Sequence, residues 1–225
     1  MDERERQQRI AASRAGRRAA ADGEPTAWFD PLYAAAQQAD DPESVPWVDL
    51  APNRVLRAWL AEAAPVPTRC LVIGSGLGDD AALLAEAGHA VTAFDVAPTA
   101  VAWSRRRFPH LPIDWTVARL EDPPAAWVRG FPLVVEVYTV QSLPLAVRRD
   151  TCAACARLVA PGGRLVAVAR GRDDAETDPK GPPWPLSQAE MGWFAVDGLA
   201  VERLDALPDP DDARTLRRLG VFRRP

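Results

Sequence analysis

From residue 68 onward, short apolar runs alternate with longer segments in which apolar residues recur at helical spacing. The apolar runs have the length of buried strands and cover 69–74, 90–95, 113–118, 131–138 and 164–169. The amphipathic segments between them cover 79–88, 98–108 and 144–159. Strands that alternate with helices of this length predict βαβ units and therefore a parallel sheet.

The pattern changes near the C-terminus. A polar loop at 171–186 and a short helix near 187–195 precede two strand-like segments, at 199–207 and 215–224. Only the acidic stretch PDPDDA (208–213) separates these two segments. Such a short connection predicts an antiparallel hairpin at the edge of the sheet.

The N-terminal region has a different composition. Residues 1–25 are rich in Arg and Ala and are expected to form a flexible arm. Residues 26–66 contain two helical segments separated by a proline-broken loop, and we expect them to form a helical cap or lid. With the core at 67–225, residues 26–225 then form a single domain without internal repeats.

Three glycines at alternate positions, Gly74, Gly76 and Gly78, follow the first strand and precede its helix. Without side chains, such a loop lets backbone amides approach a ligand at the carboxyl ends of the strands. Dinucleotide-binding loops have the spacing G-x-G-x-x-G/A, which would place a small residue where this chain has Asp79. An acid there repels a pyrophosphate and favours a cationic cofactor without phosphates.

S-adenosylmethionine is a cofactor of that kind, because its ammonium and sulfonium groups are positive and it lacks phosphates. Asp79 or backbone carbonyls of the loop could face that charge. Asp95 ends the second strand, 21 residues after Gly74, at the place where an acid accepts hydrogen bonds from ribose hydroxyls.

The segments CLVIGSGLG (70–78), FDVAPTAV (94–101) and LVAPGGRLVAVAR (158–170) resemble the class I S-adenosylmethionine-dependent methyltransferases. The resemblance implies an α/β, Rossmann-like, seven-stranded sheet of order 3-2-1-4-5-7-6 whose last strand is antiparallel. WFDPLY (28–33), VPWVDLAPNRVL (45–56) and GPPWPLSQAE (181–190) are similar to the thiopurine and thiol S-methyltransferase group, in which an aromatic cap closes over the cofactor.

This resemblance implies a set of residues that contact the cofactor: Trp47, Gly74, Ser75, Gly76, Gly78, Asp95, Val96, Arg119, Leu120, Glu136 and Tyr138. Asp95 would hold the ribose, and Glu136 and Tyr138 would lie beneath the sulfonium. Two positions depart from the family pattern, since Val72 and Arg119 stand where an acid is common. Methyl transfer would leave S-adenosylhomocysteine as the product.

The chain offers few groups that could serve as a base. His89 and His110 fall in the turns that lead into strands two and three, at the opposite edge of the sheet, and Lys180 is the only lysine. A thiol ionises in part at neutral pH and is a strong nucleophile without help. The shortage of bases therefore favours S-methylation of a small thiol.

No residue is assigned as catalytic, although Tyr138, Glu136 or Asp30 could assist. O- or N-methylation of an aromatic small molecule is the alternative reaction. A cofactor-binding protein without catalysis is a third interpretation.

The candidate contacts for the methyl acceptor are mainly aromatic and come from the cap, the strand ends and the GPPW loop. They are Trp28, Phe29, Tyr33, Gln141, Arg170 and Trp184. Arg170 and Arg172 could bind a carboxylate of the acceptor, or could form ion pairs with Asp173 or Asp174.

Composition restricts the partners. The formal net charge of −4 gives no reason to expect nucleic acid, and no apolar run has the length of a membrane span. Cys152 and Cys155 form one CxxC without a second pair of ligands, which indicates buried helix positions and no metal site. We expect a cytoplasmic protein, a monomer or weak homodimer, whose partner is a small-molecule methyl acceptor.

Overall fold

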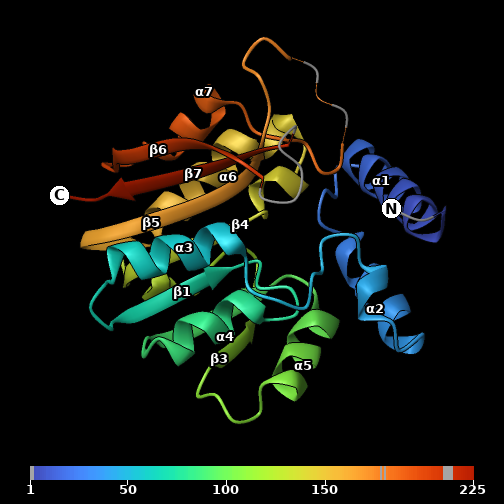
Figure 1. Cartoon of the computed structure of the whole chain (residues 1–225), viewed down its shortest axis with the longest axis horizontal. Helices are drawn as coiled ribbons and strands as arrows, with labels where there is room; N and C mark the ends of the chain where they lie inside the picture. The colour runs from blue at the N-terminus through green and yellow to red at the C-terminus, as the bar shows by residue number, and fades with distance from the viewer. Residues whose placement is uncertain (1–2, 178, 180, 210–214) are drawn as a thin grey trace.

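The computed structural model describes residues 3–177, 179, 181–209 and 215–225. These residues form a seven-stranded sheet of order β3-β2-β1-β4-β5-β7-β6 (Figure 1). The strands are β1 (Arg69–Ile73), β2 (Ala90–Asp95), β3 (Asp114–Val117), β4 (Phe131–Val137), β5 (Val159–Gly171), β6 (Ala200–Pro208) and β7 (Leu216–Arg223). The strand order is the predicted one, and β7 is antiparallel to both of its neighbours, so the predicted fold class is confirmed.

Helices cover both faces of the sheet, which explains why the central strands are apolar at consecutive positions. One face packs against α3 (Arg54–Ala63), α4 (Asp79–Glu86) and α5 (Pro98–Arg107). The other packs against α6 (Leu145–Arg157) and α7 (Gln188–Met191). Val72 faces the first layer and Leu71 and Ile73 face the second, so the two apolar clusters share one strand.

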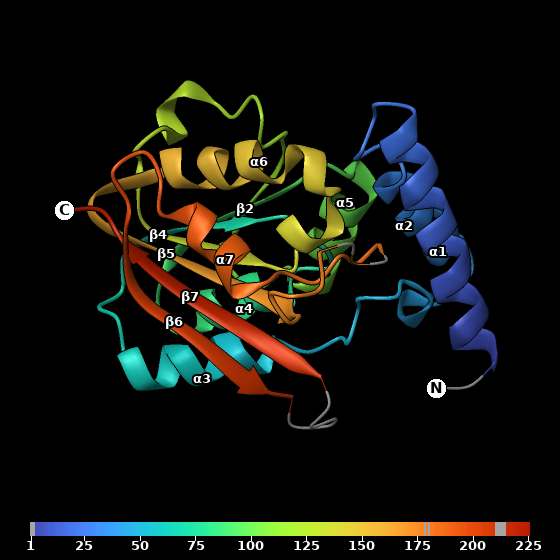
Figure 2. The same ribbon diagram turned by 90° about the horizontal axis from the view of Figure 1, so that it is seen from above.

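Two N-terminal helices, α1 (Glu3–Ala21) and α2 (Phe29–Gln38), lie beyond the carboxyl ends of the parallel strands (Figures 1 and 2). The carboxylate of Asp30 on α2 accepts a 2.8 Å hydrogen bond from the Thr99 N–H in the first turn of α5. Tyr33 and Ala36 of α2 pack against Ala97 and Ala100. The predicted cap is thereby fixed to the start of α5.

Residues 3–21, predicted as part of a flexible arm, form the helix α1. Ala12 and Ala19 of this helix pack against Trp28. The Ser13 hydroxyl and the Arg17 guanidinium both donate to the Gly181 carbonyl, at 3.2 and 3.0 Å. In this structure α1 therefore contacts both the cap and the loop that follows β5.

The remaining short helices are 3₁₀ turns at Pro42–Ser44, Ala125–Trp127, Val140–Ser142 and Gly192–Phe194. The strands at both ends of the predicted C-terminal hairpin are present, whereas most of its PDPDDA turn lies outside the described residues. No helix in the described ranges has both the length and the apolar character that crossing a membrane requires.

A buried ion pair attaches the loop after β5 to α6. Arg148 is 0% exposed and donates to the Trp184 carbonyl at 2.7 Å and to the Glu190 carboxylate at 3.2 Å. Glu190 also pairs with Arg172 at 2.8 Å. This pairing replaces the ion pair with Asp173 or Asp174 that the sequence had suggested for Arg172, because Glu190 offers a buried carboxylate.

Arg148→Met should lower the free energy of unfolding by about 3 kcal/mol, because it removes one of the two cations paired with the buried Glu190 carboxylate and the guanidinium donor of the Trp184 carbonyl. Urea denaturation measures this. The matched control is Arg149→Met at the next, exposed position, where the guanidinium stacks 4.1 Å from the Trp193 ring. That control should cost less than about 1 kcal/mol. Equal losses in the two variants would contradict the role given to Arg148.

Candidate active site

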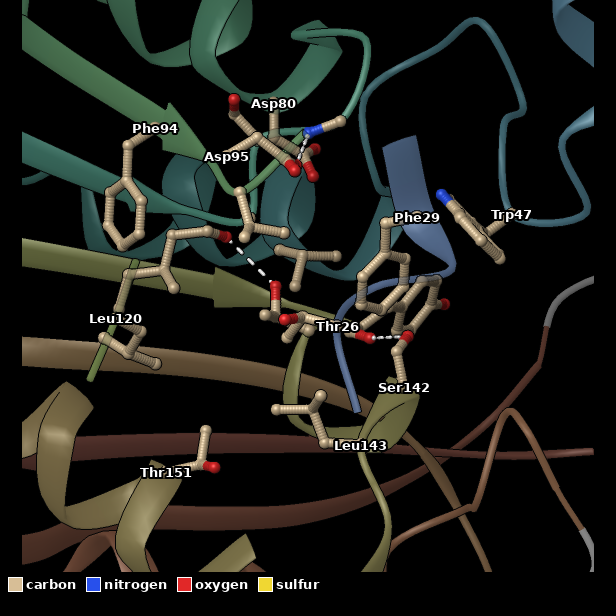
Figure 3. Close-up of a pocket in the computed structure, with 18 of the residues that line it drawn as sticks. Thr26, Phe29, Trp47, Asp80, Phe94, Asp95, Leu120, Ser142, Leu143 and Thr151 are labelled. Atoms are coloured by element: carbon tan, nitrogen blue, oxygen red, sulfur yellow. Dashed lines mark hydrogen bonds between the residues drawn. The ribbon is translucent and has the colours of Figure 1, made fainter. Parts of the chain in front are cut away.

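A cavity of about 570 Å³ opens at the carboxyl ends of β1, β2 and β4. Its lining comes from the cap, the glycine loop, the strand ends and α6. In Figure 3 the carboxylates of Asp80 and Asp95 lie on one side of this cavity and Leu143 lies on another, while Phe29 and Trp47 border it from the cap. The cavity therefore has a charged side and apolar sides.

The glycine loop needs its glycines for both conformation and space. Gly74, Gly76 and Gly78 have φ values of 60°, 53° and 91°, which residues other than glycine rarely adopt. A Cβ at Gly78 would lie 2.5 Å from the Trp115 ring, and one at Gly74 would collide with Thr139. All three glycines and Ser75 line the cavity, as predicted from the loop.

Asp95 joins the glycine loop to the end of β2. One carboxylate oxygen accepts the Gly76 N–H and the other accepts the Ala97 N–H, both at 2.9 Å. Burial raises the pKa of Asp95, and these N–H donors oppose that shift. Each carboxylate oxygen has further lone pairs, so Asp95 can also accept hydrogen bonds from ligand hydroxyls in the cavity that it lines.

Asp79 has a partner that the sequence did not predict. Its two carboxylate oxygens bind the Arg107 guanidinium at 2.7 and 2.9 Å. Arg107 lies at the end of α5 and also donates to the Leu77 carbonyl. Although Asp79 borders the cavity, its charge is neutralised by an arginine that the sequence did not place beside it.

The next residue, Asp80, is the acid that sequence reasoning missed. It lines the cavity, and one of its oxygens accepts a 2.7 Å hydrogen bond from the Asn53 N–H. Burial, opposed by the Asn53 N–H and reinforced by the carboxylates of Asp79 and Asp49, raises the pKa of Asp80 to about 6. The pair of adjacent acids after the last glycine was the signal in the sequence, and both of them line the cavity.

Aromatic side chains form the cap side of the cavity. Tyr33, Phe29 and Trp47 all line it, and the Tyr33 hydroxyl accepts a 2.8 Å hydrogen bond from Trp47 Nε1. The rings of Phe29 and Trp47 meet edge to face, 5.8 Å apart. These contacts hold a rigid apolar wall against the glycine loop.

Tyr138, at the end of β4, lines the cavity with a backbone conformation that large side chains rarely adopt. Its φ is 63°, and its N–H donates to the Val168 carbonyl at 2.9 Å. Backbone strain of this kind concentrates at functional sites. Burial raises the pKa of the phenol, so Tyr138 is protonated at neutral pH.

Several predicted site residues lie outside the cavity lining: Trp28, Asp30, Arg119, Glu136, Gln141, Arg170 and Trp184. Arg119 is exposed and lies 3.7 Å from Glu121, whereas Leu120 and Val96 do line the cavity. Trp28 packs within the cap, and its Nε1 donates to the Pro25 carbonyl.

Three polar residues of this group, Asp30, Gln141 and Glu136, accept hydrogen bonds from backbone N–H groups. Asp30 caps α5, and the Gln141 side-chain oxygen accepts the Arg170 N–H at 2.6 Å. Glu136 is 1% exposed, and one oxygen accepts the Val140 N–H at 2.8 Å. Burial raises the pKa of Glu136 to about 8, so it is largely protonated at neutral pH, and it does not lie in the cavity.

The histidines are remote from the cavity. His89 is buried at the opposite edge of the sheet, where its Nδ1 accepts the Thr68 N–H at 3.2 Å. His110 is exposed in the turn before β3, and Lys180 lies outside the described residues. Among the residues that the structure describes, therefore, no histidine or lysine lines the cavity.

The cysteines and the potential metal ligands lie outside the cavity or form no cluster in the described residues. Cys152 and Cys155 are buried on α6, as expected for helix positions that face the core. Within the described ranges, no cluster of histidine, cysteine and acidic side chains could hold a metal ion.

The lining fits S-adenosylmethionine. Carboxylates from Asp49, Asp80 and Asp95 give the cavity a negative potential that suits a cation. The Ser75 Oγ is buried and has no hydrogen-bond partner among the described residues, so a polar ligand group can use it. The positive φ of the three glycines brings the backbone, rather than side chains, to the cavity surface.

Comparison with known proteins agrees with this geometry. Residues 70–163 match a family model described as a methyltransferase domain. A probable thiol methyltransferase 2 from Arabidopsis thaliana is 28% identical over 150 residues, in an alignment that spans 65% of this chain and 65% of that relative. The chain thus covers slightly less than two thirds of the relative's length.

Two solved structures share the fold. One, described by the conversion of a disulfide bond into a thioacetal group during echinomycin biosynthesis, has a TM-score of 0.70 and 22% identity and covers 88% of this chain and 91% of its own. The 1,6-didemethyltoxoflavin-N1-methyltransferase of Burkholderia thailandensis has a TM-score of 0.65 and 19% identity, covering 87% and 90%. These likenesses show that the chain shares its fold with both structures, and residues 70–163 of that fold are similar to a methyltransferase domain.

Proposed function

We propose that this protein transfers a methyl group from S-adenosylmethionine to the sulfur of a small-molecule thiol. The observation that carries the proposal is a cavity suited to the cofactor that has no histidine or lysine in its described lining. When bound, the cofactor supplies a methyl group on a sulfonium, which needs no further activation. What remains for the protein is to bind both substrates, to orient the acceptor toward the methyl group and to exclude water.

In this proposal the cofactor's parts follow the polarity of the lining. Asp95 accepts hydrogen bonds from the ribose hydroxyls. Asp80 faces the ammonium group, since the position where related proteins often have an acid for this contact is Val72 here. Leu120 and Leu143 flank the adenine from the apolar side. Tyr138 and the Phe29–Trp47 wall confine the acceptor above the glycine loop.

The protonation states favour a thiol over an alcohol or phenol. Burial raises the pKa of both Tyr33 and Tyr138, so neither phenol is ionised at neutral pH. An acceptor that loses its own proton is therefore the best match. The likeness to a probable thiol methyltransferase supports the same acceptor class.

The second candidate is O- or N-methylation of an aromatic small molecule. The aromatic wall formed by Phe29 and Trp47 favours an aromatic acceptor of either chemistry. An amine that is neutral at physiological pH also needs no base before it attacks.

Matched acceptors separate the two reactions. Purified protein with radiolabelled S-adenosylmethionine should methylate thiophenol at least ~100-fold faster than phenol, since the thiol ionises more readily and sulfur is the stronger nucleophile. Aniline tests the N-methylation alternative under the same conditions. Transfer to phenol or aniline without transfer to thiophenol would refute the thiol proposal, whereas loss of all transfer despite cofactor binding would refute both.

Asp95→Asn should weaken S-adenosylhomocysteine binding by roughly 10- to 100-fold, because a charge-assisted hydrogen bond to a hydroxyl contributes about 1.5–3 kcal/mol. Isothermal titration calorimetry measures the dissociation constant. Asp114→Asn, at an exposed position at the start of β3, is the matched control and should leave the affinity unchanged. Equal affinity of Asp95→Asn and wild type would reject the ribose contact.

The affinity for S-adenosylhomocysteine should fall roughly tenfold from pH 7 to pH 5. The pKa of Asp80 is about 6, so its carboxylate is ionised above that pH and is lost as a partner for the ammonium below it. Asp80→Asn should remove most of this dependence and weaken binding at pH 7.

The ligand 5′-methylthioadenosine, which lacks the amino acid part, provides the control for Asp80. Its affinity should be the same for wild type and Asp80→Asn. If the substitution weakens 5′-methylthioadenosine as much as S-adenosylhomocysteine, Asp80 acts on the whole cavity rather than on the ammonium.

A further inference from the structure

We infer that Arg170 and Arg217 form a subsite for a carboxylate carried by the methyl acceptor. The inference rests on the proposed function, because it names a class of acceptor, an acidic thiol, for the same cavity. It begins from two rows of side chains that face α3 and α4 from β5 and β7.

Both rows are apolar until they reach the cavity edge of the sheet. On β5, Val166 and Val168 are completely buried, and the next inward position is Arg170. On β7, Leu219 belongs to the same apolar cluster, and the next inward position toward that edge is Arg217. Each row therefore ends in an arginine where an apolar residue would continue the core.

The two arginines are direct partners across the β5–β7 ladder. Side chains at such positions leave their Cβ atoms about 4.5–5.5 Å apart, and like charges placed there destabilise the sheet. Burial and the proximity of Arg217 and Arg9 lower the pKa of Arg170 accordingly. An anion bound between the two guanidinium groups would relieve this repulsion.

One described carboxylate already offsets part of the charge of the pair. Asp209 forms an ion pair with Arg217, and the exposed Asp49 lies near Arg170. Even so, Arg217 Nη1 is buried without a hydrogen-bond partner in the described part of the chain. No hydrogen bond or ion pair to a described residue involves the Arg170 guanidinium, so the pair retains free donors.

The pair adjoins the cavity through Tyr138. The Arg217 guanidinium lies over the Tyr138 ring, 5.6 Å from its centroid, and the same ring lines the cavity. An acceptor that lies against Tyr138 with its sulfur toward the glycine loop can extend its other end toward the arginines. Guanidinium groups bind carboxylates with two parallel hydrogen bonds, which gives both affinity and orientation.

The test compares the binding of 3-mercaptobenzoate with that of its methyl ester, which has the same thiol and ring but no charge. Calorimetry is carried out on protein saturated with S-adenosylhomocysteine. Wild type should bind the acid at least tenfold more tightly than the ester, and the preference should shrink as the salt concentration rises. In Arg170→Gln and in Arg217→Gln, the ratio of the two affinities should fall to twofold or less.

Arg223→Gln provides the matched control, because Arg223 is an exposed arginine on the same strand and should keep the wild-type ratio. Arg217→Lys should keep part of the preference, since it retains the charge and loses the bidentate geometry. A wild type that does not distinguish acid from ester, or an unchanged ratio in both glutamine variants, would overturn the subsite.

The experiment distinguishes failure of the proposed function from failure of the carboxylate subsite. If S-adenosylhomocysteine does not bind to wild type, the proposed function itself is wrong. If it binds to wild type and to both glutamine variants with equal affinity, the variants are folded and the ratio of acid to ester reports on the subsite alone.

Discussion

The hydrogen bonds between the Asp95 carboxylate and the Gly76 and Ala97 N–H groups hold the loops that follow β1 and β2 at a fixed separation. Gly74, Gly76 and Gly78 have no side chains to pack against β2, and their positive φ angles favour glycine. A carboxylate at the end of β2 is what replaces those contacts. The same carboxylate lines the cavity, so the group that orders the loop also faces the cavity.

The sequence predicted the features that depend on local pattern. Strand and helix periodicity gave the order of elements, and the resemblance gave the strand order. The glycine spacing placed Gly74, Gly76 and Gly78 at the cavity, because only backbone conformation and the end of β1 decide their position. Asp95 was found for the same reason, since it ends a strand next to that loop.

What the sequence left undetermined concerns polar side chains whose partner is distant in sequence. Asp79 is paired with Arg107, 28 residues away, which no local pattern indicates. Glu136 and Gln141 lie near the correct strand end but satisfy the N–H groups of Val140 and Arg170. Sequence pattern locates a polar residue along the chain, whereas the choice between ligand and backbone depends on which N–H groups the tertiary structure leaves without a partner.

The hydrogen bond from the Thr99 N–H to Asp30 couples the cap to the sheet. The cap and the first turn of α5 share it, so moving α2 away from the sheet would uncover a helix N-terminus and return a carboxylate to water. The order of the cap and the order of the first turn of α5 are therefore linked, although 69 residues separate the two partners along the chain.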